Sequence, residues 1–290
     1  MAIAGTKSAG YYRARRINTL LLSVLLFYSL LPILYLVISA TKTQKELFTT
    51  FGLWFGDTNN LRNNLRDLAT YDGGIYFRWL LNTLIYSASG AAIATALCAL
   101  IAWAFAKYEF RGRKIMYSIV LGALMVPQTV LAIPIFLMFA KIGLINTPFA
   151  VILPSIVFVP GVFLMHVYIQ QSVPTELIEA ARTDGAGEFR IFFAIALRLM
   201  TPGLATVFIL SFVSCWNNYF LPLVVLNSTD LLPLTVGLAN WYATASNTSG
   251  GQSLHAIILA GALISIVPII VTFLFTQRYW QSGLAAGAVK

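Results

Sequence analysis

Charged residues are scarce in this chain of 290 residues: they make up 10% of the sequence, whereas 59% of the residues are hydrophobic. A soluble globular protein carries about a quarter charged residues, so a chain surrounded by water on all sides is not expected. Strict alternation of apolar and polar residues is also missing from the long apolar runs, which disfavours a membrane barrel. Lipid is therefore the expected solvent, and helices are the expected way of crossing it.

Cysteines and recognisable catalytic motifs are equally rare. The two cysteines, Cys98 and Cys215, fall inside apolar runs, and their spacing indicates neither a disulfide framework nor a metal site. The phosphate-binding pattern GxxxxGK[ST] is missing, so ATP hydrolysis by this chain itself is not expected. Ser, His and acidic side chains do not converge in a predictable way, which leaves no catalytic residues. The sequence has a net charge of +9, but its Lys and Arg residues do not form a cluster with aromatic residues that could stack on bases. No nucleic-acid site is therefore expected.

Six apolar segments are each long enough to cross a bilayer, which takes about 20 residues. They are Ile17–Ala40, Leu80–Phe105, Ile115–Ala140, Phe149–Gln170, Leu199–Pro222 and Ala256–Thr276. With the N-terminus in the cytoplasm, 13 of the 19 Lys and Arg residues fall in inner segments and six in outer segments. This excess follows the positive-inside rule. The sequence therefore predicts an all-α membrane protein with six transmembrane helices and both termini in the cytoplasm.

With this topology, every Asp, Glu, Lys and Arg falls in a loop or at a helix end. Membrane carboxylates commonly carry proton relays or bind coupling ions, so a proton-coupled carrier is disfavoured. A stand-alone sodium-coupled carrier stays open, because backbone carbonyls at broken helices can bind the ion. Prolines that could supply such breaks, or simply kink helices for packing, are Pro127, Pro134, Pro160, Pro202 and Pro268.

One polar segment, Glu179–Ala186, lies between two apolar runs. Pro174 and Thr175 are typical of a helix start, with Thr as a possible cap. Asp184-Gly185 predicts the helix end, because Gly adopts positive φ readily. A second helix is expected from about Gly187 to Leu199, with an apolar face formed by Phe189, Phe192, Phe193 and Ile195.

Two interpretations of this helical hairpin remain open. It fits an ordinary hairpin at the membrane surface. It fits equally a site gripped by a partner protein, since the small side chains of Ala180 and Ala181 allow close approach and Glu179 can pair with a basic residue. The long outer loop, about Thr41–Trp79, is less informative: Leu61–Leu68 could form an amphipathic helix on the membrane or a solvated loop.

Several motifs of this sequence resemble the permease subunits of ATP-binding-cassette importers, in particular the maltose type of sugar permease. The resemblance covers about Leu80–Lys290. It is carried by Glu179-Ala180-Ala181 with Asp184-Gly185-Ala186, by Met125-Val126-Pro127-Gln128, by Trp216-Asn217-Asn218-Tyr219, and by the C-terminal segment from Gln277 to Lys290. The chain departs from the family at Arg198, where Pro is usual, and at Asn218, where Glu is usual.

The resemblance implies a six-helix importer subunit in the bacterial cytoplasmic (inner) membrane. Residues 1–79 would hold a cytoplasmic segment, the first transmembrane helix and an extracytoplasmic loop; residues 80–290 would form the permease core, with a coupling helix at about 175–185. Implied partners are a second homologous permease, two ATPase subunits that bind ATP and Mg, and an extracytoplasmic sugar-binding protein. The implied cargo is an oligosaccharide, with a polyol or glycerol-phosphate as the alternative.

Two groups of site residues follow. The resemblance assigns contact with the ATPases to Glu179, Ala180, Ala181, Asp184 and Gly185. A sugar presents apolar ring faces and many hydroxyls, so aromatic rings and planar amides near membrane depth are candidates for the substrate path. They are Asn82, Gln128, Trp216, Asn217, Asn218 and Tyr219. The same polar groups could instead join helix to helix.

Overall fold

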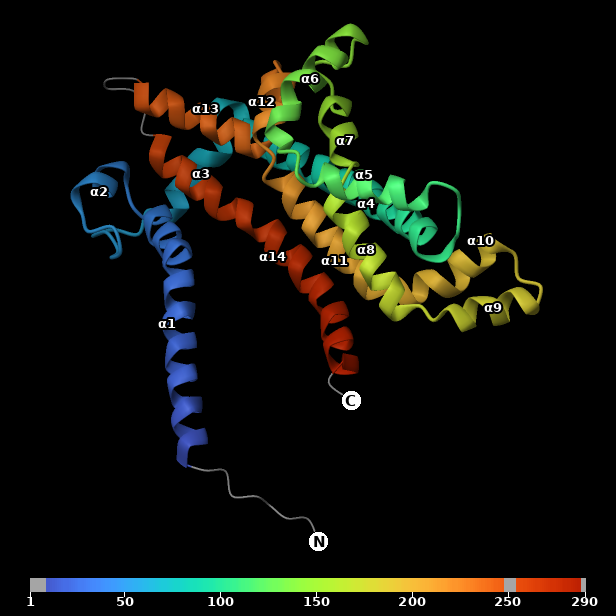
Figure 1. Cartoon of the computed structure of the whole chain (residues 1–290). Helices are drawn as coiled ribbons and strands as arrows, with labels where there is room; N and C mark the ends of the chain where they lie inside the picture. The colour runs from blue at the N-terminus through green and yellow to red at the C-terminus, as the bar shows by residue number, and fades with distance from the viewer. Residues whose placement is uncertain (1–8, 248–253, 288–290) are drawn as a thin grey trace. The chain divides into compact units, whose positions relative to one another are not determined.

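The computed structural model of the chain describes residues 9–247 and 254–287, and every regular element in these ranges is a helix (Figure 1). The last three residues of the C-terminal motif, 288–290, lie outside the described residues. The helices belong to two compact units, Met1–Thr70 with Ala245–Ile264 and Tyr71–Thr244 with Ser265–Lys290. The prediction of an all-α protein is confirmed for the described ranges.

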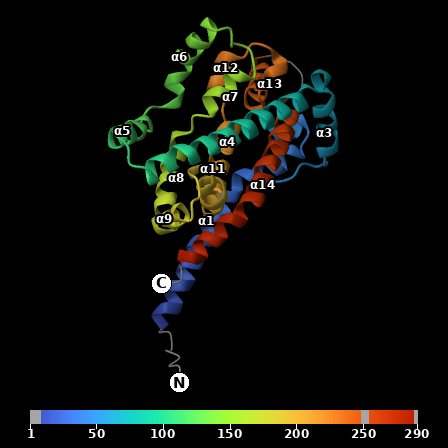
Figure 2. The same ribbon diagram turned by 90° about the vertical axis from the view of Figure 1, so that its right-hand side faces the viewer.

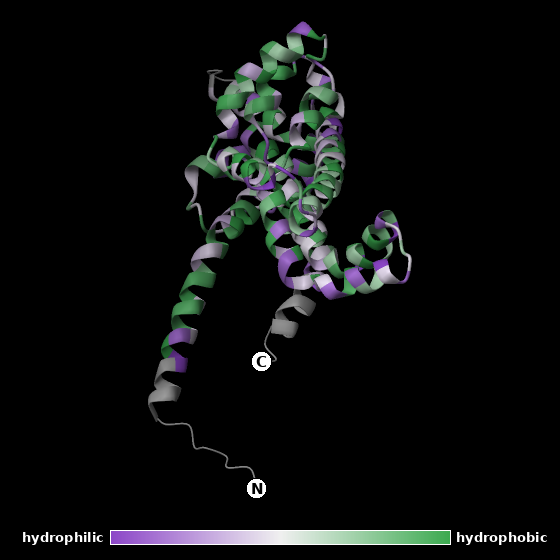
Figure 3. Ribbon diagram, turned by 45° about the vertical axis from the view of Figure 1, so that its right-hand side comes forward, coloured by the Kyte–Doolittle hydropathy of each residue, from purple (hydrophilic) through white to green (hydrophobic). Residues whose placement is uncertain are grey.

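The first unit begins with α1 (Ala9–Ala40), which contains the predicted span Ile17–Ala40. Large apolar side chains are exposed along most of this helix. Figure 3 colours much of its ribbon as hydrophobic. A helix that is apolar around its whole circumference is suited to lipid rather than to water. Two short helices follow, α2 (Gln44–Thr49) and α3 (Leu61–Thr70), so the segment Leu61–Leu68 is helical; its position on the membrane stays a prediction.

Buried polar side chains hold the loop around α2 in a fixed shape. Lys42 is 1% exposed and donates hydrogen bonds to the Thr50 hydroxyl at 2.9 Å and the Phe51 carbonyl at 2.8 Å. Asn64 of α3 donates to the carbonyls of Ala40 and Lys42. The loop is therefore tied both to itself and to the end of α1.

The second unit is built around α4 (Ile75–Lys107), which contains the predicted span Leu80–Phe105 and follows the short turn η1 (Tyr71–Gly74). It packs mainly on α8 (Val159–Ser172) and α11 (Leu197–Trp216), beside which it runs in Figures 1 and 2. Small residues line its buried face, including Gly90, Ala94 and Cys98. Small side chains let membrane helices approach closely, which maximises van der Waals contact.

Seven further helices of the described chain lie outside the polar segment 175–196. They are α5 (Arg113–Ala123), α6 (Gln128–Lys141), α7 (Phe149–Ser155), α12 (Phe220–Val225), η3 (Thr229–Leu231), α13 (Leu234–Asn247) and α14 (Leu254–Gly287). Within the described ranges, five helical stretches are long and apolar enough to cross a membrane, or up to six if one bent pair counts as a span. The predicted span Ala256–Thr276 lies within α14.

The predicted span Ile115–Ala140 is wrong as a single helix. It consists of α5 and α6, which meet at an angle of 101°. The amides of Leu124, Met125 and Val126 bond the carbonyls three residues back, and this tight turn ends α5. Pro127 cannot donate a ladder hydrogen bond and takes the position just before α6, so the second helix starts in a new direction.

Two other predicted spans are interrupted as well. Phe149–Gln170 is divided between α7 and α8 by Ile156–Phe158, close to Pro154 and Pro160. The predicted span Leu199–Pro222 is divided by Asn217–Tyr219, because α11 ends at Trp216 and Pro222 belongs to α12.

A pH dependence is expected for the loop around α2. Backbone and hydroxyl hydrogen bonds from Thr43, assisted by the amides of Asp57 and Thr58, lower the pKa of Glu46 below its ordinary value of 4.5. The ionised form therefore stabilises the loop at pH values above 4.5, and this contribution is lost as the pH falls through the lowered pKa. Hydrogen-exchange protection factors of the Asp57 and Thr58 amides should drop in that acid window.

The variant Glu46→Gln is the control, since it has no proton to gain. Its protection factors should be lower than those of the wild-type chain at neutral pH and independent of pH below 4.5. Equal acid sensitivity in both proteins would show that another group controls the loop.

Candidate functional site

The polar segment forms a helical hairpin whose first arm is α9 (Thr175–Thr183). Pro174 precedes it with an extended backbone, φ −62° and ψ 138°, and makes no side-chain cap. The expectation that Thr175 caps the helix is therefore wrong, because Thr175 is already its first helical residue. The helix itself and its start next to Pro174 agree with the sequence.

The turn that ends α9 is closed by two backbone hydrogen bonds. The amide of Gly185 bonds the Arg182 carbonyl at 3.0 Å, and the amide of Ala186 bonds the Ala181 carbonyl at 2.9 Å. This is the pattern of a Schellman C-cap, which places the next residue after the cap in the left-handed region. Gly185 has φ +78°, as the Asp184-Gly185 pair predicted.

The second arm differs from the predicted helix Gly187–Leu199. It starts with α10 (Glu188–Arg190), continues as the π-helical segment η2 (Ile191–Ala196), and passes without a break into α11. Arg198, where the resembling family usually has proline, is exposed inside this continuous helix. The predicted apolar face is half confirmed: Phe192 is 6% exposed, whereas Phe189 is 83% exposed.

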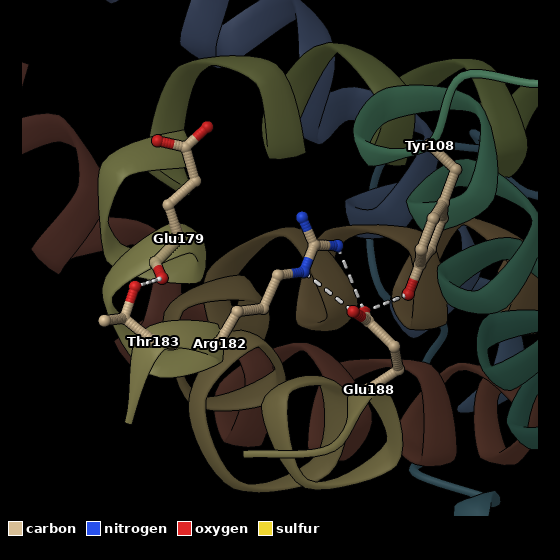
Figure 4. A network of polar contacts seen from close by, with 5 residues as sticks. All are labelled: Tyr108, Glu179, Arg182, Thr183 and Glu188. Carbon is tan, nitrogen blue, oxygen red and sulfur yellow. Dashed lines mark hydrogen bonds and ion pairs between the residues drawn. The ribbon is translucent and has the colours of Figure 1, made fainter. Parts of the chain in front are cut away.

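An ion pair across the turn joins the two arms of the hairpin (Figure 4). Arg182 donates from Nε to one carboxylate oxygen of Glu188 at 2.7 Å and from a terminal nitrogen to the other at 3.2 Å. The hydroxyl of Tyr108, which directly follows α4, donates to the same carboxylate at 2.5 Å. Burial and the bond to Glu188 raise the pKa of Tyr108.

The exposure of this network sets its strength. Arg182 and Glu188 are 41% and 45% exposed, so the pair stabilises the hairpin by only about 0.5–1 kcal/mol. Its two-pronged geometry nevertheless fixes how the arms are oriented, because both guanidinium bonds must point along one carboxylate.

The five predicted ATPase-contact residues divide into two groups. Glu179, Ala180, Asp184 and Gly185 are exposed, and in Figure 4 the carboxylate of Glu179 points away from Arg182. Ala181 is 8% exposed and packs inside the chain. Its small side chain therefore permits close packing within the hairpin, and only Ala180 of the two alanines is open to a partner.

A continuous apolar core lies beneath the hairpin. Ile178 and Ala181 of α9 belong to one buried cluster with Trp103 of α4, Val173 and Phe192. The rings of Trp103 and Phe192 are 5.7 Å apart. The hairpin is thus anchored to the membrane helices by packing as well as by hydrogen bonds.

Two of the predicted substrate-path residues are buried. Asn82 is 6% exposed, and its amide nitrogen donates to the carbonyls of Asp230 at 2.7 Å and Leu232 at 3.0 Å. Trp216 is 4% exposed and packs in a cluster with Ala91 and Phe212. Both contacts join parts of the chain to one another, which was the alternative interpretation of these residues.

The other four candidates lie at helix ends. Gln128 is the exposed first residue of α6, at the bend. Asn217, Asn218 and Tyr219 form the break between α11 and α12. The side-chain amide of Asn217 caps α11 by donating to the Val213 carbonyl at 2.9 Å, and the side chain is exposed. A role of these residues in a substrate path stays a prediction.

Sequence reasoning missed several polar contacts between distant segments. Lys107 donates to the Val173 carbonyl at 2.6 Å, and Asn146, with φ +58°, binds the amides of Asn227 and Ser228 through its side-chain oxygen. In the sequence, Lys107 begins the basic stretch Lys107–Lys114, which also fits a topology anchor, so its charge gave no specific signal. The available signal for a left-handed residue at Asn146 was an Asn in a short connection between Gly143 and Pro148.

Within the described ranges, no group of three or more His, Cys, Asp and Glu side chains could hold a metal ion. Cys98 and Cys215 are free thiols. Several helices long and apolar enough to cross a bilayer define a multi-pass membrane protein, and the exposed polar hairpin is its candidate site.

Comparison with known proteins identifies the family. Residues 94–281 match the family described as "Binding-protein-dependent transport system inner membrane component", and the chain belongs to it. It is therefore a non-catalytic permease subunit of an ATP-binding-cassette importer, located in the inner membrane, and ATP hydrolysis belongs to partner ATPases. An importer of this class also includes a further permease subunit and a substrate-binding protein.

The arabinooligosaccharide transport permease AraQ of Halalkalibacterium halodurans is 37% identical over 91% of this chain and 92% of its own length. The melibiose/raffinose/stachyose import permease MelC of Bacillus subtilis is 32% identical over 72% of this chain and 75% of its own. The fold matches the crystal structure of a bacterial ABC transporter involved in alginate import, with a TM-score of 0.78, 23% identity, and coverage of 95% of this chain and 99% of that one.

The turn of the hairpin should not tolerate a side chain at Gly185. A β-branched residue is poorly accommodated at φ +78°, so Gly185→Val should destabilise the turn by at least about 1–2 kcal/mol and reduce uptake by the assembled importer. Gly187→Ala is the matched control, because Gly187 has φ −71° and open space around its Cα. Normal uptake by Gly185→Val would show that the turn geometry is not needed.

Proposed function

We propose that this chain is one half of the translocation pore of a carbohydrate importer, and that it receives the work of ATP hydrolysis through the hairpin α9–α10. The importer would contain a second homologous permease, two ATPase subunits that bind ATP and Mg, and an extracytoplasmic sugar-binding protein. Closure of the ATPases would move the hairpin as a rigid body and switch the pore between inward-facing and outward-facing states.

The orientation follows from the charge distribution. The hairpin and the basic loop that contains Arg111, Arg113 and Lys114 fall on the side that the positive-inside rule assigns to the cytoplasm. Both chain termini would then be cytoplasmic, and the loop around α2 would be extracytoplasmic. Labelling that places Glu179 outside the cell would contradict this orientation.

The observation that carries the proposal is the state of Glu179. Arg182, the nearest basic residue along α9, is engaged by Glu188 instead. Among the described residues this is the one ion pair, so the exposed carboxylate of Glu179 is left for a basic residue outside the chain. Ala180 beside it allows a close approach, and Leu177, 41% exposed, offers an apolar contact.

Reversal of this charge should uncouple the importer. Breaking a buried charge pair at an interface costs about 2–5 kcal/mol, so Glu179→Lys should reduce ATP-driven uptake more than tenfold, at about 1.4 kcal/mol per factor of ten. The amount of protein in the membrane should not change, because the side chain is exposed. Uptake and ATP hydrolysis would be measured with the complex in vesicles.

Glu109→Lys is the matched control: it makes the same charge reversal on an exposed residue of the neighbouring loop. If the two variants transport equally well, Glu179 is not the coupling contact. If the tagged wild-type chain brings down no ATPase and accumulates sugar alone, the proposed function itself fails.

A carbohydrate is proposed as the cargo because AraQ and MelC are named for oligosaccharide transport. The polyol alternative has no specific observation in its favour, and family membership gives no support to a stand-alone sodium-coupled carrier. The polar groups at the helix breaks are the proposed substrate contacts of this chain: Gln128, Asn217 and Tyr219, which are exposed, and Asn218, which is half-buried. Asn82 and Trp216 would act by holding the pore wall.

Removal of a substrate contact should weaken uptake without affecting assembly. A neutral hydrogen bond contributes about 0.5–1.5 kcal/mol, so Asn217→Ala and Gln128→Ala should each raise the apparent KM for the sugar about threefold to tenfold. Gln170→Ala is the control, because Gln170 is an exposed amide at the end of the predicted span Phe149–Gln170 and away from the helix breaks. A KM equal to that of the control would place the substrate path elsewhere.

A further inference from the structure

The helix α4 differs from the other candidate spans in having no proline. The other spans contain Pro32 in α1, Pro134 in α6, Pro154 in α7, Pro160 in α8, Pro202 in α11 and Pro268 in α14. At 1.5 Å per residue, the 33 residues of α4 extend about 50 Å, which exceeds the roughly 40–45 Å of a bilayer with its headgroups. A helix of this length is long enough to reach the aqueous layer on both sides of a bilayer.

The inner end of α4 holds both arms of the hairpin. Lys107, its last residue, donates to the Val173 carbonyl at 2.6 Å and the Thr175 hydroxyl at 3.3 Å, where α9 begins. Tyr108, the next residue, donates to Glu188, where α10 begins. Two consecutive residues therefore hold both arms of the hairpin by hydrogen bonds, in addition to the packing of Trp103 of α4 on Phe192.

The outer end of α4 holds the extracytoplasmic segment 229–234 through consecutive backbone groups. The indole of Trp79 donates to the Thr229 carbonyl at 2.8 Å, and the hydroxyl of Tyr86 donates to the Leu231 carbonyl at 3.0 Å. Asn82 donates to the carbonyls of Asp230 and Leu232, as described above. The amide of Leu234 donates to the Thr83 hydroxyl at 2.7 Å.

These outer contacts are well buried and closely packed. Trp79, Asn82, Thr83 and Tyr86 are each at most 6% exposed. A Cβ at Gly237 of α13 would lie only 2.1 Å from the Trp79 ring, so that helix also rests directly on α4. Because the α4 side chains that bind its carbonyls are buried and closely packed, segment 229–234 is expected to follow a movement of α4.

We infer that α4 is the transmission element of this permease: it joins the hairpin α9–α10 to the outer segment 229–234, so that the two move as one body. Lys107 and Tyr108 are the inner positioning residues, and Trp79 and Asn82 the outer ones. This inference rests on the proposed function, in which ATPases bind the hairpin. Coupling between two sites is reciprocal. A change at the ATPases must therefore alter the outer segment, and a change at the outer segment must alter the ATPases.

The test perturbs the inner side and reads the outer side. The complex of this chain with its co-purifying ATPases is trapped with ATP, Mg and vanadate, and amide hydrogen exchange is followed in the peptide 227–237. Coupling between sites typically corresponds to factors of 5–150, so trapping should change the exchange rate there by at least about fivefold in the wild type. Tyr108→Phe, which removes only the hydroxyl, should reduce this change to less than about twofold.

Tyr117→Phe is the matched control. It removes a hydroxyl from a tyrosine on the neighbouring helix α5 and keeps the ring contacts with Phe105 and His166. It should retain the wild-type response to trapping. A purely local role of Tyr108 would leave the nucleotide response intact, so equal responses of Tyr108→Phe and Tyr117→Phe would overturn the inference. Lys107→Met gives a second inner variant with the same expected loss.

A double variant tests whether one element carries the signal. Asn82 and Tyr108 are 26 residues apart, about 39 Å along the helix, a distance at which independent effects simply combine. The double variant Asn82→Ala with Tyr108→Phe is trapped in the same way. If α4 moves as one body, the double variant's change in exchange of the peptide 227–237 should be no smaller than the smaller of the two changes shown by the single variants. A response reduced by the product of both single effects would contradict a shared element.

Failure of this inference is distinct from failure of the proposed function. If no ATPase co-purifies, the importer assignment is wrong. If the wild-type complex hydrolyses ATP and transports sugar, but trapping leaves the outer peptide unchanged, the importer assignment stands and α4 is not the transmission element.

Discussion

The close packing of α4 against α8 and α11 is the constraint on which the position of the hairpin depends. Lipid gives no hydrophobic drive for helices to associate, so contact between small residues must supply the attraction. A Cβ at Gly161 of α8 would lie 2.8 Å from both Cys98 of α4 and Val207 of α11, which shows how near the three backbones come. This packing fixes the position of α4, and the hydrogen bonds of Lys107 and Tyr108 then position the hairpin relative to it.

The location of the apolar spans could be predicted from hydropathy, because burial in lipid demands long apolar runs. The breaks between helices could not be predicted in this way, because an average of hydropathy does not depend on the direction in which the chain runs. Proline was no reliable signal: Pro127 lies at the 101° bend between α5 and α6, whereas Pro202 lies inside the continuous helix α11. Which proline interrupts a helix depends on whether neighbouring segments can satisfy the freed carbonyls, and that is a property of the packed bundle.

The hairpin turn could be predicted because it depends on local backbone preference at Gly185. Its side-chain partners could not. Along α9, Arg182 is spaced to pair with Glu179, yet it binds Glu188 across the turn. Similarly, Asn82 and Trp216 carry the chemistry of sugar recognition, but their burial against other parts of the chain is decided by tertiary structure. Residue type and spacing indicated chemistry; the packed fold decided where that chemistry is used.

In segment 229–234, the groups that fix the backbone conformation differ from the side chains that form the exposed surface. Its backbone carbonyls from Thr229 to Leu232 are bound by side chains of another helix, while Thr229 and Asp230 themselves remain exposed. Side chains at these two positions can therefore be exchanged without altering the backbone that presents them. Such an arrangement would let the chemistry of this surface change by substitution while the backbone beneath it keeps its shape.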